Sequence, residues 1–465
     1  MYELHELCRG KQYRIFPQFN SARSIDSLKT ENKNLSHSPV VLQREDHNIS
    51  RDNISEHALK VLYRLKKSEH AAYLVGGGVR DLLLDRHPKD FDIATDALPE
   101  SIGGLFRNSR MIGRRFRLVH VHFGRDIIEV ATFRGHEGDV EEEGANDRDI
   151  KNGMLIRDNI FGTIEEDAWR RDFTINSLYY NIHDFSVVDY TGGLEDLQNK
   201  LIRIIGDPHQ RYQEDPVRML RAARFAAKLE FNIEASTAAP IAELADRIAH
   251  VPPARLFEEV LKLFLSDQSV ATFKLLRKYN LFDKLFPFTA TNLNAENSSS
   301  HDTEDFIIQG LANTEERIAQ GKPVNPGFLF AIMLWRPMQD MVADYIERGA
   351  RPLQAYQQAG TEILSQQTKV IALPKRFGTQ IREIWSLQVR LGNRNGKRAY
   401  RMLTLPRFRA AYDFLLLRAQ SNEPELQPLC DWWTEFQEVG DKERASMIKK
   451  VQPVRRKAKK TRNRR

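Results

Sequence analysis

A glycine turn and two nearby aspartates are the residues of this chain whose types and spacing could carry out chemistry. The apolar run Tyr73–Val75 is typical of a strand, and Gly76–Gly78 leads directly into a segment with apolar helical spacing. A strand, a glycine turn and the start of a helix form a place where backbone N–H groups can receive phosphate. Asp90 and Asp92 follow within a few residues.

The two aspartates are separated only by Phe91, and this spacing predicts a metal site. On a strand, residues i and i+2 point to the same face, so both carboxylates would face one way. Two carboxylates held side by side repel each other unless a cation lies between them. A phosphate-binding turn followed by paired carboxylates is the equipment of phosphoryl or nucleotidyl transfer. The glycine spacing matches neither a P-loop nor a dinucleotide-binding fingerprint.

The runs LVGGGVRDLLL and KDFDIAT resemble the head motif of the class II nucleotidyltransferases of the polymerase β superfamily. That family contains the bacterial poly(A) polymerases and the CCA-adding tRNA nucleotidyltransferases. Further similar motifs follow in the family's order: DIIEVATFR from Asp126, RRDFTINSLYY from Arg170 and EDPVRMLRAARFAAKL from Glu214. The segment Met111–Phe123 is similar to the stretch that marks the poly(A) polymerase branch. The resemblance is strong over roughly residues 55–270 and weaker up to about residue 420.

The resemblance implies an enzyme that adds adenylates from ATP to RNA 3′ ends, those of mRNA and other transcripts, without a template. It implies two Mg²⁺ ions and release of pyrophosphate. A CCA-adding enzyme is the alternative, because its catalytic motifs are nearly the same. A non-catalytic RNA-binding protein on the same fold is a further alternative, against which the intact Asp90, Asp92 and Asp172 argue. RNA-decay or RNA-chaperone proteins are candidate partners, and a monomer is expected.

Asp90 and Asp92 are the expected metal ligands, and two residues compete for the third carboxylate. Glu129 lies in the β-prone run DIIEVATFR, where a neighbouring strand could bring it beside the aspartates, although an outward position fits the pattern equally well. Asp172 is the aspartate of RRDFTIN, and the resemblance implies that it is catalytic together with the two metal-site aspartates. Which of the two contacts metal stays open.

The nucleotide is expected to be bound by residues from several motifs. Arg171 should meet the triphosphate, because a guanidinium group suits phosphate geometry. Asn176, four positions after Asp172, would support the same face. The resemblance implies the remaining contacts: Asp215 and Arg218 read the base, Arg221 and Arg224 hold phosphates, and Gly77, Gly78 and Arg80 bind the nucleotide.

The segment from Glu214 also has an interpretation that needs no ligand. Asp215 before Pro216 is typical of an N-cap followed by proline at the first helical position, and capping alone could explain the aspartate. The three arginines after it recur every third residue and form a positive stripe on the predicted helix. Such a stripe is usually a solvated face, and beside a nucleotide pocket it becomes a reader of base and phosphate.

Composition excludes several other classes of protein. The chain has 465 residues, enough for two or more domains. Its two cysteines, Cys8 and Cys430, lie far apart, which excludes a disulfide framework and a cysteine-built zinc site. No apolar run approaches the ~20 residues of a membrane span, and the first residues do not resemble a signal peptide. A cytoplasmic location is expected.

The predicted fold class is α+β: a nucleotidyltransferase head with a small mixed β-sheet and helices, followed by a mostly helical neck, body and RNA-binding region. The expected organisation is a mobile N-terminal extension (1–52), the catalytic head (53–200), a helical neck that recognises the base (201–270), a helical body that binds RNA (271–445) and a basic disordered tail (446–465).

Positive charge is concentrated at the end of the chain. Eight of the eleven residues in Arg455–Arg465 are Lys or Arg, so the net charge of +7 falls to about −1 without them. Such a tail is suited to sequence-independent attraction to RNA phosphates. Leu373–Trp385 and Gly396–Phe414 mix basic residues with aromatics, as base-stacking surfaces do. Apolar helical spacing explains most of these aromatics as core residues instead.

Overall fold

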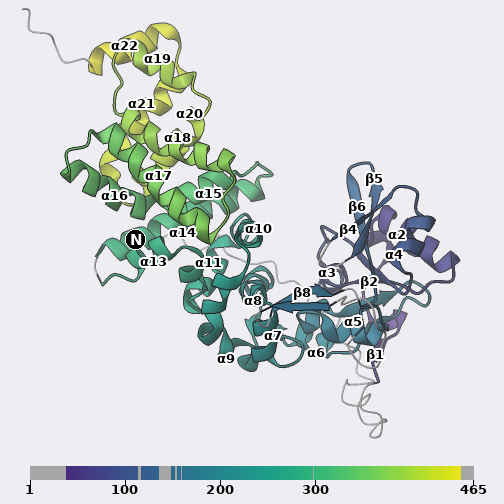
Figure 1. Ribbon diagram of the computed structural model, residues 1–465. Helices are drawn as coiled ribbons and strands as arrows, with labels where there is room; N and C mark the ends of the chain where they lie inside the picture. The colour runs from purple at the N-terminus through teal and green to yellow at the C-terminus, as the bar shows by residue number, and fades with distance from the viewer. Residues whose placement is uncertain are drawn as a thin grey trace, which may run out of the picture. The chain divides into compact units, whose positions relative to one another are not determined.

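The computed structural model describes residues 38–113, 117–135, 148–151, 154–158, 160–296 and 298–451. Its contacts divide the chain into two compact units (Figure 1). The first contains the chain up to Arg218 together with Glu230–Leu244, and the second contains Met219–Leu229 and the chain from Ala245 onward. The first unit is built on a mixed β-sheet and the described elements of the second are helices, which confirms the predicted α+β class.

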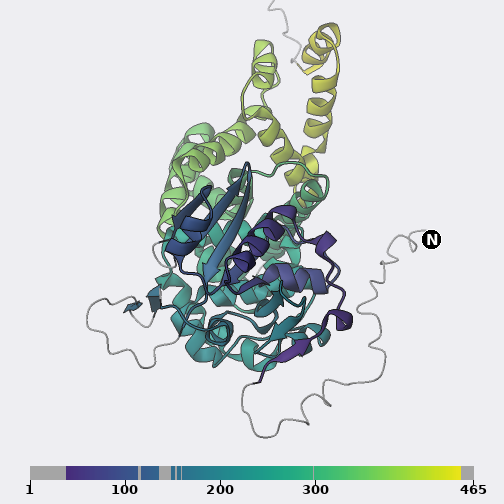
Figure 2. The ribbon, with the colours of Figure 1, turned by 90° about the vertical axis from the view of Figure 1, so that its right-hand side faces the viewer.

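An eight-stranded sheet lies at the centre of the first unit, in the order β1-β10-β9-β2-β3-β6-β5-β4. Figure 2 shows the strands of this sheet from a second direction. β3 and β6 are parallel and the other neighbours in this sheet are antiparallel, so the sheet is mixed, as predicted. The strands are β1 (Val40–Leu42), β2 (Ala72–Val75), β3 (Asp92–Thr95), β4 (Ser109–Ile112), β5 (Leu118–Phe123), β6 (Asp126–Thr132), β9 (Leu178–Asn181) and β10 (Val187–Asp189).

Helices and two short strand pairs complete this unit. α2 (Glu56–Lys67) packs on β2, β3 and β6 through an apolar stripe that includes Val61 and Leu62. Ser55 caps the start of this helix by accepting a hydrogen bond from the Ala58 N–H. The other elements are α3 (Gly77–Leu83), α4 (Pro99–Leu105), β7 (Arg148–Lys151), β8 (Met154–Asp158), α5 (Ile164–Arg170), α6 (Gly193–Gln198), β11 (Leu201–Ile202), α7 (Pro208–Glu214), β12 (Asn232–Ile233) and α9 (Ala235–Leu244), after α2 (Glu56–Lys67).

Part of the segment expected to be an N-terminal extension, residues 1–52, belongs to the sheet. Val40–Leu42 forms the edge strand β1 and pairs antiparallel with β10. The run Val-Val-Leu is β-prone, and pairing with an open sheet edge satisfies its backbone groups. Residues 1–37 and the basic stretch Arg455–Arg465 lie outside the described residues, and α22 (Asp441–Val451) continues into the segment expected to be tail.

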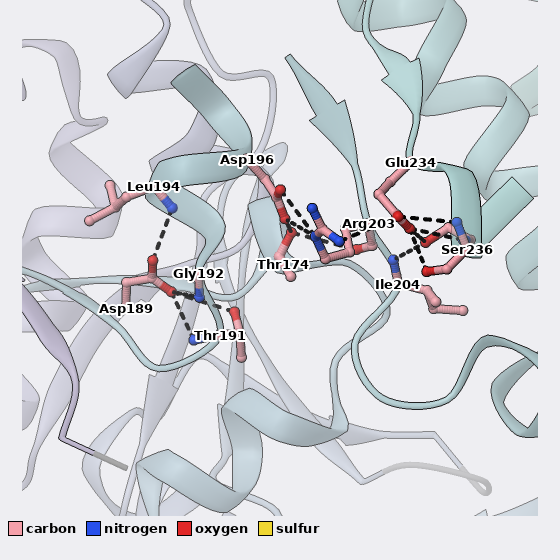
Figure 3. Close-up of polar contacts among 11 residues, drawn as sticks. Thr174, Asp189, Thr191, Gly192, Leu194, Asp196, Arg203, Ile204, Glu234 and Ser236 are labelled. Carbon is pink, nitrogen blue, oxygen red and sulfur yellow. Dashed lines mark hydrogen bonds and ion pairs between the residues drawn. The ribbon is translucent and has the colours of Figure 1, made fainter. Parts of the chain in front are cut away.

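A polar network fixes the RRDFTIN segment within the first unit (Figure 3). Thr174 donates to Asp196 (2.6 Å), which also accepts from Arg203 (3.0 Å). Arg203 in turn pairs with Glu234 (3.5 Å), so α6, the loop after β11 and the start of α9 are tied together. Gly193 permits this packing, because a Cβ there would lie 2.3 Å from the Thr174 carbonyl oxygen. The segment that carries Arg171 and Asp172 is therefore held by buried contacts on the side of Thr174.

The second unit is an assembly of helices that continues in green and yellow in Figure 1. α8 (Val217–Leu229) leads into it from the first unit. Among the residues that the structure describes, none of the helices is long and apolar enough to span a membrane. The helices that follow are α10 (Pro253–Phe264), α11 (Ser269–Lys278), α12 (Leu281–Leu285), α13 (Pro287–Leu293), α14 (Ser298–Ala319), α15 (Pro326–Met333), α16 (Trp335–Glu347), α17 (Pro352–Val370), α18 (Lys375–Leu391), α19 (Lys397–Leu403), α20 (Phe408–Ser421) and α21 (Gln427–Glu438), with α22 last.

Most aromatics of the two basic segments lie in the core of this unit. Trp385 and Phe414 are fully buried. Phe408, Tyr412 and Trp433 belong to one buried hydrophobic cluster, in which the Phe408 ring packs against the other two rings. This confirms their interpretation as core residues and leaves the basic side chains of both segments as the groups that reach the surface.

Candidate active site

The predicted glycine turn lies where β2 passes into α3. Gly76 has a φ of 74°, a conformation that L side chains rarely adopt, and it ends the pairing of β2 with β3. A Cβ on Gly78 would lie 3.4 Å from the backbone oxygen of Asp90, and one on Gly77 would lie 3.4 Å from Arg80 Nη2. The turn therefore lies directly against the first of the two aspartates and against the side chain of Arg80.

Asp92 begins β3, and the parallel register of β3 and β6 places Glu129 directly beside it. Asp90 lies just before the strand, so the expectation that both aspartates belong to one strand is wrong for Asp90. The physical reason is that the partner strand β2 ends at Val75, opposite Asp92, where Gly76 turns the chain away. Glu129 also lies 3.2 Å from His120 Nε2 on β5, so it stands between a histidine and an aspartate in one cross-strand row.

The electrostatics of Asp92 are those of a carboxylate crowded by like charge. Burial raises the pKa of Asp92 to about 6, and the charges of Glu129 and Asp90 raise it as well, while Arg171 lowers it. Like charges held together in a partly buried place are favourable when a cation neutralises them. The charge of Glu129, one of the two candidates for the third carboxylate, acts on Asp92.

The donor set fits Mg²⁺, which prefers hard oxygen ligands and is commonly held by one or two carboxylates together with substrate phosphates. Within the described ranges, no three His, Cys, Asp or Glu side chains are grouped closely enough to hold a metal by themselves. Asp90 and Asp92 would therefore supply the protein ligands, with phosphate and water oxygens completing the coordination.

Arg171 lies beside the glycine turn and is fixed by two anchors. Its Nη2 pairs with Asp167 (2.9 Å), and its Nε donates to the hydroxyl of Tyr179 (2.9 Å), which itself donates to Asp167 (2.7 Å). Although burial opposes it, the contacts with Tyr179 and Asp167 raise the pKa of Arg171, so the guanidinium stays charged. Its Nη1 would lie 3.6 Å from a Cβ on Gly76, so this nitrogen faces the turn.

Asp172, Asn176 and Arg80 form a chain of hydrogen bonds. Asn176 Nδ2 donates to Asp172 (3.2 Å), and Asn176 Oδ1 accepts from Arg80 Nη1 (2.6 Å). The other side of the Arg80 guanidinium pairs with Asp81 (2.6 Å), and Arg80 is only 2 % exposed. The contact predicted between Asn176 and Asp172 is thus present. The structure places Arg80 beneath the turn as a buried link between α3 and the RRDFTIN segment.

The predicted base readers lie at the junction of α7 and α8. Asp215 accepts a hydrogen bond from the Val217 N–H (3.3 Å), so it does cap the start of α8. Arg218 Nη1 donates to Glu214 (3.0 Å) and to the Arg211 carbonyl oxygen (2.7 Å), which fixes its side chain.

Arg221 and Arg224 lie further along α8, among the residues of the second unit. Their guanidinium groups lie 5.3 and 4.7 Å from the centroid of the Phe225 ring. Such cation–π contact holds the two arginines along one side of the helix.

Sequence reasoning missed the residues that hold the predicted ones in place. Asp167 and Tyr179 position Arg171, and Glu214 and Arg211 position Arg218. Burial lowers the pKa of Arg211 to about 10, and the charge of Arg218 lowers it further. One signal was available for each pair, because Asp167–Arg171 and Glu214–Arg218 both have the i, i+4 spacing of a helical ion pair.

Three family models match parts of the chain. Residues 72–203 match the family model "Poly A polymerase head domain". Residues 230–293 match "Probable RNA and SrmB- binding site of polymerase A", and residues 348–465 match "Polymerase A arginine-rich C-terminus".

Individual relatives extend the match over nearly the whole chain. The chain is 53% identical to poly(A) polymerase I of Salmonella typhimurium, over 89% of each chain. It is 39% identical to the CCA-adding enzyme of Lactobacillus helveticus, but over only 47% of this chain and 52% of that one. In structure, the CCA-adding enzyme of Thermotoga maritima complexed with tRNA is similar over 89% of this chain and 95% of its own, with a TM-score of 0.57 at 18% identity, which shows a shared fold.

The mixed sheet and the glycine turn, together with the match to the poly A polymerase head domain, define a nucleotidyltransferase. Similarity to CCA-adding enzymes in sequence stops at about half of the chain, whereas similarity to poly(A) polymerases does not. The chain belongs to the bacterial poly(A) polymerase I family.

Proposed function

We propose that the head of this protein transfers AMP from ATP to the 3′-hydroxyl of RNA, without a template, at the carboxylates beside its glycine turn. As a member of its family the chain is an ATP-dependent polynucleotide adenylyltransferase. The observation that carries the proposed mechanism is the position of Asp90 against the Gly76–Gly78 turn and of Asp92 close by, beside Glu129, with the Arg171 guanidinium facing the same turn.

The reaction forms one bond and breaks one. The 3′-hydroxyl oxygen attacks the α-phosphorus of ATP, the bond from this phosphorus to the bridging oxygen breaks, and pyrophosphate leaves while the hydroxyl loses its proton. Bound Mg²⁺ would supply a lowered pKa for the hydroxyl and neutralisation of the leaving group. Asp90 and Asp92 are the residues proposed to hold it. The ordinary pKa of a carboxyl and the raised value of about 6 both leave Asp92 ionised at neutral pH.

Arg171 is proposed to hold the triphosphate. Two of its three nitrogens are occupied by Asp167 and Tyr179, so the side chain cannot swing away from the turn. A fixed guanidinium binds a phosphate with little loss of side-chain entropy. Asp172 is proposed to act in the same reaction, held by Asn176, which Arg80 holds in turn.

RNA is proposed to be held mainly by basic side chains of the helical unit and by the basic C-terminal stretch, while Asp215 and Arg218 read the adenine base. The cytoplasm, where transcripts and ATP are both present, is the proposed compartment. A labelled RNA without tRNA structure, incubated with protein, Mg²⁺ and one nucleotide at a time, tests this function. Extension with ATP is expected, and no extension with any nucleotide would contradict the proposal.

Replacing Arg171 by Lys should raise the KM for ATP by about 10- to 100-fold while the protein stays folded. Lysine keeps the charge but cannot pair with Asp167, meet Tyr179 and still offer a nitrogen to the turn. Steady-state kinetics with varied ATP at saturating RNA measures this change.

Tyr179→Phe is the matched control, because it removes one of the two anchors and leaves the guanidinium itself. It should raise the KM for ATP less than Arg171→Lys does. An Arg171→Lys enzyme with an unchanged KM would show that Arg171 supports the fold only.

Deleting Arg455–Arg465 should weaken RNA binding and flatten its dependence on salt, with ATP affinity unchanged. The eight cations of this stretch would release counterions from RNA, and log K falls roughly in proportion to the number of phosphate contacts. Fluorescence anisotropy of a labelled RNA at several salt concentrations measures the slope. An identical slope for the truncated protein would exclude this stretch as an RNA contact.

A further inference from the structure

Two basic segments that are separate in sequence, Leu373–Trp385 and Gly396–Phe414, meet along one groove of the helical unit. The groove has a volume of about 440 Å³. α18 forms its long side, α17 contributes Gln357 and Thr361, and the turn before α20 contributes Leu405–Arg407. All of its lining residues belong to the second unit.

The lining carries a clear excess of positive charge. It contains Arg382, Arg390 and Arg407, and its one acidic residue is Glu383. Arg407 Nε lies 3.4 Å from Glu383 Oε2, so the acid offsets the charge of one arginine at most. A lining with three arginines and one glutamate attracts a ligand with several negative charges.

The amphipathic pattern of α18 fixes this set on one face. Thr379, Arg382, Glu383, Ser386 and Arg390 recur at helical spacing and line the groove. The opposite face is buried in the core, where its largest members are Phe377, Ile381, Ile384, Trp385 and Leu391.

α17 and α18 approach closely beside the groove. Gly360 makes this possible, because a Cβ there would lie 3.2 Å from the Trp385 ring and 3.6 Å from Arg382 Cγ. The groove is therefore set by core packing, and its arginines are carried by a fixed wall.

The arginines follow the groove instead of converging on one small anion. Arg382 and Arg390 are eight residues apart, about 12 Å along the helix axis. Arg382 Nη2 donates to Thr379 Oγ1 (3.5 Å), which directs it toward the start of α18 and away from Arg390. A polyanion matches this spacing better than a single phosphate ion.

The chemistry of the lining indicates how such a polyanion would be read. The large aromatics of both segments are turned into the core: Trp385 is 0 % exposed, Phe408 5 % and Phe414 0 %. Stacking on bases needs exposed rings. The groove instead offers guanidinium groups and hydroxyls, and the contacts that such groups make with phosphates carry no sequence information.

We propose that this groove binds the sugar-phosphate backbone of single-stranded RNA, independently of base sequence. Arg382 and Arg390 contact phosphates, and the negative charge of Glu383 weakens the binding. The inference rests on the proposed function, which makes RNA the substrate, and deepens it by assigning a binding site in the helical unit.

The test is the binding of fluorescent 20-nucleotide oligo(A), oligo(U) and oligo(C) to the full chain without ATP, at several salt concentrations. Arg382→Ala/Arg390→Ala should weaken binding of all three oligonucleotides about tenfold near 0.1 M salt. It should also reduce the slope of log K against log salt by about 1.4, because each phosphate contact on a single strand contributes roughly 0.7. Glu383→Gln should act in the opposite direction and tighten binding by about two- to threefold.

Arg348→Ala/Arg351→Ala is the matched control, since these two exposed arginines lie outside the groove and carry the same total charge. It should leave the slope close to that of the wild type. An equal loss in the control and groove variants, or an unchanged slope in the groove variant, would overturn the proposal. A loss confined to oligo(A) would also overturn it, because the groove would then read bases. Since binding is measured without ATP, these outcomes are separate from failure of the adenylation reaction itself.

Discussion

Asp92→Asn is expected to abolish adenylate transfer while leaving the head folded. The substitution keeps the size of the side chain but removes one charged ligand from the site that activates the 3′-hydroxyl. Loss of that interaction corresponds to several kcal/mol of transition-state stabilisation, or a fall in kcat of about 10³-fold or more. Single-turnover extension of a labelled RNA at saturating Mg²⁺ and ATP measures this fall.

The same substitution should stabilise the protein when no metal is present. The pKa of Asp92 is raised from 3.8 to about 6, first by burial and then by Glu129, so the folded state binds this proton more tightly than the unfolded chain does. Stability therefore falls as pH rises from about 4 to 6, and above that range the ionised side chain costs at most about 3 kcal/mol. Asn removes this cost, so the variant should have the higher Tm near pH 7.5 without metal, and the difference should vanish near pH 4.

Mg²⁺ provides the decisive comparison between the two proteins. It should raise the Tm of the wild type at pH 7.5 and have much less effect on Asp92→Asn. Asp126→Asn, an exposed carboxylate on β6, is the control and should retain activity and the Mg²⁺ response. Near-normal turnover by Asp92→Asn would remove Asp92 from the proposed metal site.

The sequence was sufficient to predict the glycine turn and a strand at Asp92, because each depends on local chemistry. Gly76 must adopt a positive φ, and an aspartate in a KDFDIAT motif begins a strand beside that turn. What sequence alone left open was the competition between Glu129 and Asp172. The parallel register of β3 and β6 is a long-range pairing, and it alone puts Glu129 next to Asp92.

Buried partners were the part of the site that the sequence could not predict. The resemblance implies that Arg80 contacts the nucleotide, and in the structure its buried guanidinium also pairs with Asp81 and Asn176. Asn176 is 96 residues away along the chain, so no local pattern signals this contact. Arg80 thereby links α3 to the RRDFTIN segment through Asn176.

The fold was predictable where the periodicity was long or the turn chemistry distinctive. The hairpin of β5 and β6 follows from two β-prone runs around Gly124, which has a φ of 65°. The edge strand β1 and its neighbour β10, of three residues each, were not singled out. Three residues carry too little pattern to predict a strand, and only the open edge of the sheet decides whether such a segment pairs.

The two residues proposed to read the base, Asp215 and Arg218, are both held by nearby groups of the chain. Its Nη1 is engaged by Glu214 and by the Arg211 carbonyl oxygen, and Asp215 is engaged by the Val217 N–H. Adenine offers a donor at N6 and an acceptor at N1, which a carboxylate and a guanidinium can read together. A pair fixed by its own chain favours one setting of the pocket, as an enzyme that adds a single kind of nucleotide requires.

Long adenylate runs are therefore expected on unstructured RNA with ATP alone, with little or no extension from CTP. A CCA-adding enzyme must read C as well as A and must stop after three additions, so its pocket has to change with the primer. Gel analysis of a labelled generic RNA and of a tRNA that ends before its CCA, each with ATP or CTP separately, measures the choice. Glu214→Gln should relax it, raising CTP incorporation relative to ATP, because Arg218 loses a charged anchor. Efficient CTP addition to the tRNA by the unaltered protein, without processive growth on generic RNA, would instead assign it the activity of the CCA-adding enzymes, despite its match to poly(A) polymerases over 89% of the chain.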